Sequence, residues 1–234
     1  MSKQILPSNI ANRLADAHQN IRVACEKSLR PVQDVTLMAV SKTKPNASII
    51  DAYHAGQRVF GENYAQELHQ KSIELSELTD IEWHYIGPIQ SNKTKIIAES
   101  AHWVDSVDRF KVAKRLNQHA IEMNKTLNIL LQVNISRSES KSGVMLENVL
   151  PLASEIIELS NLSFRGLMAI PDNYQDIEKT KAEFLTLRDC FVTLSQQYKS
   201  VDTLSLGMSG DMSIAIECGS TMVRIGTAIF GERD

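Results

Sequence analysis

The chain has 234 residues, of which 43% are hydrophobic and 23% are charged, and its formal net charge at pH 7 is −3. This composition is typical of a globular protein and indicates no strong attraction to nucleic acid or to anionic lipid. The sequence lacks both a run of about 18 apolar residues and the apolar core of a signal peptide. Its three cysteines fit no metal or redox spacing, which predicts free thiols and a cytoplasmic location.

The first predicted element is an amphipathic helix over residues 8–29. Apolar residues recur there at spacings of three and four, at Ile10, Leu14, Ala17, Ile21 and Ala24. Pro31 is expected to end the helix. Because no strand precedes it, this helix is expected to cover part of the exterior or the bottom of the fold that follows.

A short apolar strand followed by a helical stretch then repeats along the chain. Eight strands are predicted, at residues 36–41, 58–61, 82–86, 103–106, 128–134, 163–169, 203–206 and 222–226. Helices are predicted at residues 47–55, 65–78, 92–99, 110–123, 146–159, 177–198 and 211–218. No helix is predicted after the eighth strand, and the loop 171–175 is expected to be the most flexible.

Strands that alternate with helices imply right-handed βαβ units and a parallel sheet. Eight such units over about 200 residues match a (β/α)₈ TIM barrel, so the predicted fold class is α/β with one domain over residues 1–234. The alternative is an open doubly wound sheet, but the first strand is not followed by the G-x-G-x-x-G pattern of such sheets.

Functional residues of a barrel lie at the C-terminal ends of its strands. Lys42 ends the first predicted strand and is either an amine nucleophile toward a carbonyl or an ordinary surface lysine. Lys44 has left the strand and is ranked below it. Lys141 follows the fifth strand and is considered as a supporting or an alternative amine. His84 is expected to be a structural histidine.

A phosphate site is predicted after the seventh and eighth strands, at Ser209, Gly226 and Thr227. Glycine lets backbone N–H groups approach an anion and hydroxyl groups add donors, although such glycines also serve as turn residues. Asp211 is expected to cap the next short helix. An aldehyde that also carries a phosphate would use both the lysine amine and the phosphate site, and pyridoxal phosphate is such a molecule.

Arg224 lies two residues before Gly226 and is flanked by apolar residues. It is either a buried arginine paired with Glu62 or Asp211, or a fixed cation beside an acceptor nitrogen of a ligand. An arginine in the second position disfavours protonation of a pyridine nitrogen, and so weakens a pyridoxal cofactor as an electron sink.

Six segments resemble the signatures of the pyridoxal phosphate homeostasis family, also called the proline synthase co-transcribed or YggS-type family. They are residues 39–45 (AVSKTKP), 60–64 (FGENY), 82–93 (EWHYIGPIQSNK), 165–171 (RGLMAIP), 204–209 (LSLGMS) and 223–231 (VRIGTAIFG). The resemblance covers nearly the whole chain and implies a barrel like the N-terminal domain of alanine racemase. It also implies a Schiff-base lysine at Lys42, a phosphate site at Ser209, Gly226 and Thr227, Arg224 beside the pyridine nitrogen and Asn63 near the ring.

The function implied by this resemblance is pyridoxal phosphate binding and homeostasis, with an influence on amino-acid metabolism and without robust catalysis. Related B6 vitamers and apo-enzymes are the further partners considered. The alternative is a racemase-like enzyme, which needs proton carriers on both faces of the substrate carbon. Racemase relatives take one carrier, and a dimer interface, from an additional β domain that is not expected here, so a non-enzyme and a monomer are predicted. A sugar-phosphate aldolase barrel with a lysine imine is a third option. In that family the lysine usually lies on a late strand, whereas Lys42 belongs to the first.

Overall fold

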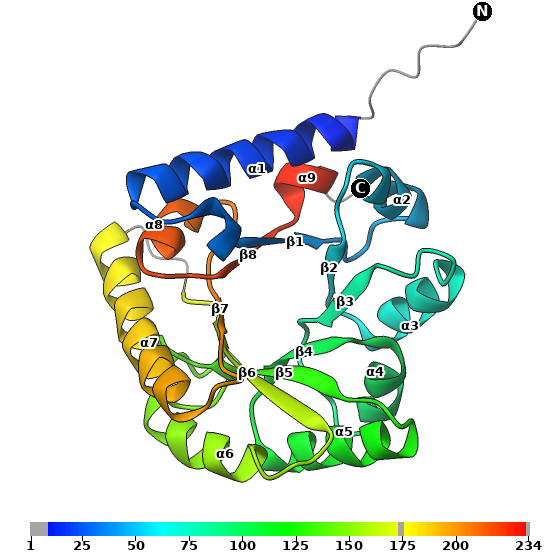
Figure 1. The fold of residues 1–234 in the computed structure, drawn as a ribbon, viewed down its shortest axis with the longest axis vertical. Helices are drawn as coiled ribbons and strands as arrows, with labels where there is room; N and C mark the ends of the chain where they lie inside the picture. Colours follow the sequence, from blue (N-terminus) through cyan, green and yellow to red (C-terminus); the bar gives the residue numbers. More distant parts are fainter. Residues whose placement is uncertain (1–8, 173–175, 233–234) are drawn as a thin grey trace, which may run out of the picture.

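The computed structural model describes residues 9–172 and 176–232. Its eight strands are all parallel to their neighbours and form a closed barrel in sequence order, with β1 paired to β8 (Figure 1). The strands are β1 Thr36–Val40, β2 Val59–Glu62, β3 Glu82–Tyr85, β4 Trp103–Val107, β5 Leu127–Val133, β6 Leu162–Ala169, β7 Thr203–Ser205 and β8 Met222–Ile225. The predicted (β/α)₈ barrel is therefore confirmed, and the open sheet is excluded.

Helices surround the barrel on its outer side. They are α1 Asn9–Lys27, α2 Asn46–His54, α3 Ala65–Glu74, α4 Thr94–Ser100, α5 Phe110–Glu122, α6 Val149–Ile156, α7 Ile177–Gln197, α8 Met212–Glu217 and α9 Thr227–Phe230, with 3₁₀ turns η1 Val32–Asp34 and η2 Leu146–Asn148. None of those within the described ranges combines the length and the apolar character that a membrane span requires. The main apolar core lies between the strands and these helices.

The opening helix α1 lies on the barrel exterior, as predicted, and packs against α2, α8 and α9 (Figure 1). Its buried residues include four of the five in the predicted stripe. Ser8, the predicted first residue, lies outside the described residues. The helix ends before Pro31, because Leu29 adopts a left-handed conformation with φ of 54°. The Arg30 N–H then donates to the carbonyl of Cys25, which closes the end of the helix.

Three details of the predicted elements were wrong. A one-turn helix, α9, follows β8 where no helix was expected. The predicted helix 146–159 begins as the 3₁₀ turn η2 and becomes α-helical only at Val149, since Pro151 has no N–H to bond back into the preceding turn. The helix predicted over 65–78 ends at Glu74 and is followed by a tight turn in which the Leu78 N–H donates to the carbonyl of Leu75. The predicted flexible loop 171–175 lies partly outside the described residues.

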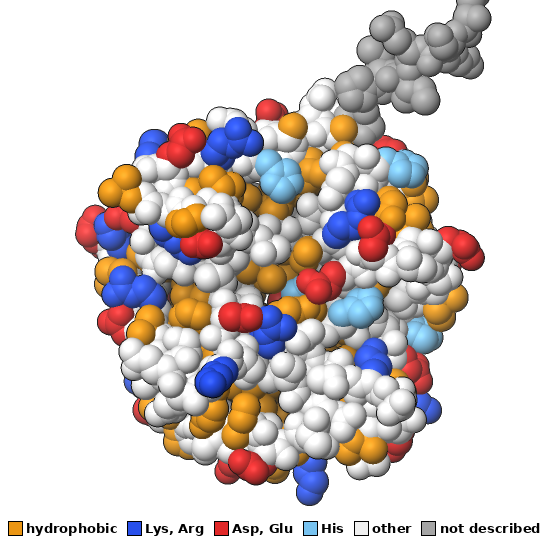
Figure 2. Space-filling view, in the orientation of Figure 1, with side chains coloured by type: hydrophobic (Ala, Val, Ile, Leu, Met, Phe, Trp, Pro, Cys, Tyr) orange, Lys and Arg blue, Asp and Glu red, His pale blue; other side chains and the backbone are white. Residues whose placement is uncertain are grey.

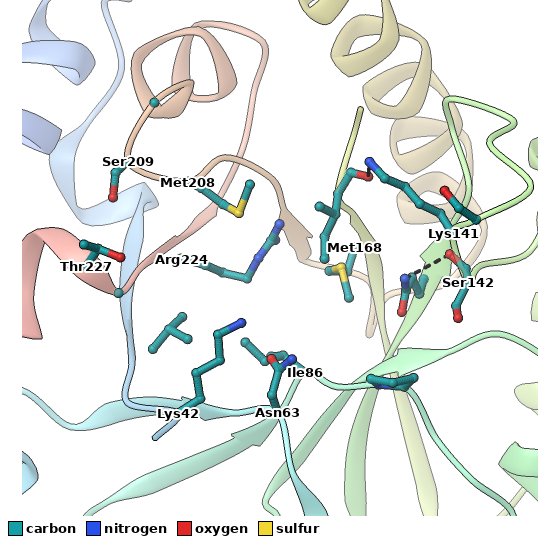
Figure 3. A pocket seen from close by; sticks show the side chains of 17 residues that line it. Lys42, Asn63, Ile86, Lys141, Ser142, Met168, Met208, Ser209, Arg224 and Thr227 are labelled. Carbon is teal, nitrogen blue, oxygen red and sulfur yellow. Dashed lines mark hydrogen bonds between the residues drawn. The ribbon is translucent and has the colours of Figure 1, made fainter. Parts of the chain in front are cut away.

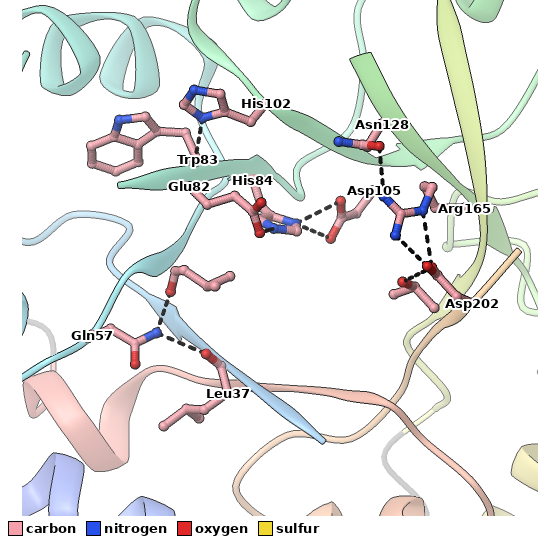
Figure 4. Close-up of polar contacts among 12 residues, drawn as sticks. Leu37, Gln57, Glu82, Trp83, His84, His102, Asp105, Asn128, Arg165 and Asp202 are labelled. Carbon is pink, nitrogen blue, oxygen red and sulfur yellow. Dashed lines mark hydrogen bonds and ion pairs between the residues drawn. The ribbon is translucent and has the colours of Figure 1, made fainter. Parts of the chain in front are cut away.

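The barrel interior contains charged groups as well as apolar ones. His84 is fully buried and contacts Asp105 at 3.0 Å and Glu82 at 3.2 Å (Figure 4). Its ring also stacks on Trp103. Burial opposes the charged imidazole, but the two carboxylates outweigh it and raise the pKa of His84 to about 9. His84 is therefore a protonated structural residue, as the sequence indicated. On the face drawn in Figure 2, acidic and basic side chains are interspersed around the barrel.

Candidate functional site

A cavity of about 580 Å³ opens at the C-terminal ends of the strands. All six predicted site residues line it: Lys42, Asn63, Ser209, Arg224, Gly226 and Thr227. They lie at the ends of four strands, β1, β2, β7 and β8. Closure of the barrel through the β1–β8 pair brings the first and last of these strand ends together. The volume lies within the range of small-molecule sites, roughly 300–1,000 Å³.

Lys42 lies two residues after the end of β1 and is half-buried. Its side chain extends into the cavity toward Arg224, with Asn63 beside it (Figure 3). Lys44 lies elsewhere, because its amine donates to the backbone carbonyl of Glu232 at 2.5 Å and it does not line the cavity. The structure thus separates the two lysines of the motif, which are two residues apart in the sequence.

Lys141 lines the side of the cavity opposite Ser209 and Thr227 (Figure 3). Its amine donates to the backbone carbonyls of Ile170 and Pro171 and forms an ion pair with Asp172 at 2.8 Å. These contacts join the loop after β5 to the loop after β6. Lys141 therefore has the geometry of a supporting residue, one of the two roles that the sequence left open.

Ser209 and Thr227 lie on one wall of the cavity, with Gly226 between β8 and α9 (Figure 3). A Cβ atom at Gly226 would stand 3.3 Å from the carbonyl oxygen of Val40, so the absent side chain lets the end of β8 approach β1 closely. The wall thus presents two hydroxyl groups and a closely packed backbone to the cavity.

The loop after β7 is held by Asp211, although not in the predicted way. Its carboxylate accepts a hydrogen bond from the backbone N–H of Met208 at 2.6 Å, and it makes no side-chain cap to α8. The prediction of a helix cap at Asp211 was therefore wrong. The carboxylate instead closes the turn that carries Ser209, because it reaches backward along the chain.

Arg224 reaches the cavity from β8 and is nearly fully buried. Its guanidinium donates to the carbonyl and hydroxyl oxygens of Ser205, at 2.8 and 2.7 Å, and to the carbonyl of Ala169 at 2.8 Å. The predicted direct pairing with Glu62 or Asp211 is wrong. Burial lowers the pKa of Arg224 to about 10, against the opposing influence of Asp105 and Asp211, so its charge persists at neutral pH.

Asn63 occupies the loop after β2, and its backbone packs tightly against the loop after β3. A Cβ atom at Gly87 would lie 1.9 Å from the carbonyl oxygen of Asn63, so only glycine fits there. The two loops are thereby held in contact. The position of Asn63 at the cavity depends on a glycine from the neighbouring strand end.

Several residues of the cavity were not among the predicted site residues. Apolar side chains on its walls are Ile86, Met168, Ile170 and Met208, and polar ones include Gln132, Ser140 and Ser142. Their positions at strand ends were the available signal, but an apolar residue at a strand end does not differ in sequence from a core residue. The described residues contain no group of three or more His, Cys, Asp or Glu side chains placed to hold a metal ion.

The family model of the alanine racemase N-terminal domain matches residues 13–234. A pyridoxal phosphate homeostasis protein of Vibrio alginolyticus is 50% identical over 230 residues, which are 97% of this chain and 99% of the relative. The chain belongs to the pyridoxal phosphate homeostasis protein family. This membership confirms the resemblance carried by the six sequence segments.

Solved structures extend the comparison of this homeostasis-family chain. The structure of PipY from Synechococcus elongatus PCC7942 with PLP bound is 36% identical and has a TM-score of 0.82, covering 95% of this chain and 100% of PipY. An alanine racemase of Clostridium difficile 630 has a TM-score of 0.72 at 12% identity and covers 93% of this chain. At that identity the likeness concerns the fold alone. The homeostasis-family chain spans only 57% of the racemase.

Proposed function

We propose that this chain binds pyridoxal phosphate in the cavity, holds it through Lys42 and takes part in its homeostasis. The observation that carries the proposal is the convergence of the Lys42 amine, the Arg224 guanidinium and the Ser209–Thr227 wall in one cavity. The names of the relatives and the PLP-bound structure of PipY support it. B6 vitamers that share the ring, and apo-enzymes that need the cofactor, are the partners that we include in this proposal.

The residues present fit the chemistry of pyridoxal phosphate. The hydroxyl groups of Ser209 and Thr227 can donate to a phosphate, and the buried cation of Arg224 lies between them and the far wall (Figure 3). Apolar side chains on the walls, Ile86 and Met168 among them, suit the faces of an aromatic ring. The donor set and the cavity volume are therefore both compatible with the cofactor.

The aldehyde of pyridoxal phosphate supplies an electrophilic carbon, to which an uncharged lysine amine bonds as the carbonyl oxygen leaves as one water molecule. In this chain Lys42 supplies the amine. Arg224 keeps a fixed positive charge in the cavity, where it disfavours a second positive charge on a nearby ring nitrogen. Asn63 lies beside Lys42 in the cavity, where its amide group can form hydrogen bonds with polar groups of the ring.

The cavity lining argues for a carrier and against a racemase. Among the described residues that line it, the titratable side chains are Lys42, Lys141 and Arg224. Lys141 is occupied by two carbonyls and Asp172, and Arg224 by Ser205 and Ala169, so neither is placed to move a proton on the face opposite Lys42. The relatives are named homeostasis proteins, in agreement with this proposal.

The test of covalent binding compares two lysine variants. Wild-type protein titrated with pyridoxal phosphate should develop the absorbance of lysine-bound cofactor, and borohydride reduction followed by peptide mass analysis should locate it on Lys42. Lys42→Ala should lose the band, whereas Lys44→Ala, the matched control outside the cavity, should keep it. An unchanged band in folded Lys42→Ala protein would refute the assignment.

The test of the carrier role measures delivery and turnover separately. Delivery of bound cofactor to an apo-enzyme should restore that enzyme's activity, and the rate is compared with spontaneous release. Assays with L- and D-amino acids should give little racemisation. Turnover at ordinary enzyme rates, about 1–10³ per second, would instead favour the racemase alternative.

A further inference from the structure

A buried ion cluster lies behind the cavity wall, outside the site described above. The amine of Lys71, on α3, forms ion pairs with Glu62 at 2.8 Å and with Glu67 at 2.7 Å. Lys71 is 5% exposed and Glu62 is 0% exposed. None of the three residues lines the cavity. We call these three residues the Lys71 cluster.

The Lys71 cluster contacts the backbone on both sides of Lys42. Before Lys42, the Ser41 hydroxyl donates to Glu62 at 2.6 Å, and the Lys71 amine donates to the Ser41 carbonyl at 2.9 Å. After Lys42, the backbone N–H of Thr43 donates to Glu67 at 2.6 Å. Both neighbours of the proposed cofactor lysine are therefore held by one group of charges.

The segment that the cluster holds has an unfavourable backbone conformation. Thr43 has a φ of 63°, in the left-handed region that β-branched residues rarely adopt. Such a conformation persists where the surrounding contacts enforce it. The hydrogen bond from Thr43 to Glu67 is such a contact. This hydrogen bond supports the turn after β1 that carries Lys42 and Thr43.

The cluster is poorly explained as a source of stability. Removing the charged groups of Lys71 and Glu62 from water is costly, and apolar residues of similar volume often stabilise a fold as well or better. Oε2 of the buried Glu62 has no hydrogen-bond partner among the described residues, and burial raises the pKa of this carboxyl despite the opposing influence of Lys71. What the cluster does provide is a fixed geometry at Ser41 and Thr43.

We propose that the Lys71 cluster positions Lys42 for covalent capture of pyridoxal phosphate, with Lys71 as the central positioning residue. This inference rests on the proposed function of Lys42. The cluster touches neither the cavity nor the cofactor and acts through the backbone of residues 41–43. Holding the backbone restricts the directions open to the Lys42 side chain, so the amine is presented to the cavity in advance of binding.

The test separates covalent capture from binding to the cavity. Stopped-flow absorbance after mixing with pyridoxal phosphate gives the capture rate, and equilibrium titration with pyridoxamine phosphate, which has no aldehyde, gives the affinity of the cavity itself. Lys71→Met should slow capture by about tenfold or more and change the affinity for pyridoxamine phosphate by less than about twofold. Lys71→Arg, which retains a cation, should recover part of the rate.

Two controls complete the experiment. Leu116→Ala removes a buried side chain from α5 and lowers stability away from the cavity, so it should change neither measurement. Glu67→Met removes the acceptor for the Thr43 N–H while leaving the Lys71–Glu62 pair, and should slow capture even if Lys71→Met does not fold.

The outcomes distinguish this inference from the proposed function. Wild-type capture rates in folded Lys71→Met or Glu67→Met protein would overturn the positioning role. An equal loss of pyridoxamine phosphate affinity would also overturn it, because it indicates general damage to the cavity. An absorbance band that is equally strong in wild-type and in folded Lys42→Ala protein would instead overturn the proposed function. Slower capture with intact pyridoxamine phosphate binding supports the positioning role.

Discussion

Ala39 of β1 pairs with Ile225 of β8, and this pairing places the loops that carry Lys42 and Thr227 at the same end of the barrel. The two residues come from opposite ends of the sequence. Their meeting depends on closure of the barrel, because an open sheet would leave β1 and β8 on separate edges. The candidate site therefore forms only when β1 pairs with β8.

The hydroxyl wall should decide the affinity for the phosphate group. Replacing Ser209 and Thr227 by alanine removes two donors to a dianion, each worth about 1.5–3 kcal/mol, so the affinity for pyridoxal phosphate should fall by roughly a hundredfold or more. The affinity for pyridoxal, which has no phosphate, should stay nearly constant. Equilibrium titrations with both ligands check this. Ser195→Ala, on α7 and outside the cavity, is the control. Equal losses for both ligands would contradict the phosphate assignment.

Gly87 should be intolerant of any side chain. A Cβ atom there would overlap the Asn63 carbonyl group, so Gly87→Ala should lower the free energy of unfolding by about 3 kcal/mol or more. Gly210→Ala is the matched control, because a Cβ atom at that position has nothing within 4 Å. Its effect should be within about 0.5 kcal/mol. Urea denaturation of the two variants and the wild type gives both values, and similar stabilities for the two variants would argue against the close contact.

Stability should decrease at alkaline pH because of His84. Its pKa is raised from 6.5 in the unfolded chain to about 9 in the fold, so its contribution is fully present below pH 6.5 and is lost as the pH rises through 9. At about 1.4 kcal/mol per pKa unit, the full contribution is about 3 kcal/mol. Urea denaturation between pH 6 and 10 measures it, and an NMR titration of the imidazole gives the pKa directly.

The comparison for this prediction is His84→Gln, which has no titratable group at this position. The variant should be less stable overall, because Asp105 then loses its buried partner. Its free energy of unfolding should nevertheless vary less between pH 7 and 10 than that of the wild type. A variant with the same alkaline slope as the wild type would show that another group causes the decrease.

Leu29 should limit the stability of the opening helix. It is 94% exposed and has a left-handed backbone conformation, which is unfavourable for a residue with a Cβ atom. Leu29→Gly should therefore raise the free energy of unfolding by roughly 0.5–1 kcal/mol, because the relief of strain exceeds the entropy that glycine adds to the unfolded chain. Leu29→Ala retains the Cβ atom and should give no such gain. Thermal denaturation of the three proteins measures the difference.

Local sequence patterns accounted for most of the fold. All eight strands lie where short apolar runs predicted them, and the stripe of Leu14, Ala17, Ile21 and Ala24 is the buried face of α1. Element ends were less predictable, because hydrogen bonds beyond the apolar pattern decide them. Leu29 ended α1 before Pro31 could, and the short α9 had no periodicity to reveal it.

The sequence by itself determined the family, the order of the strands and six of the residues that line the cavity, since motifs at strand ends retain their meaning without coordinates. Tertiary structure decided which charges meet. Arg224 donates to Ser205 and Ala169, while Glu62, one of its expected partners, pairs with Lys71 behind Lys42. These contacts join residues from separate strands and helices, and their distances depend on how the barrel closes and how α3 packs against it, which no local pattern records.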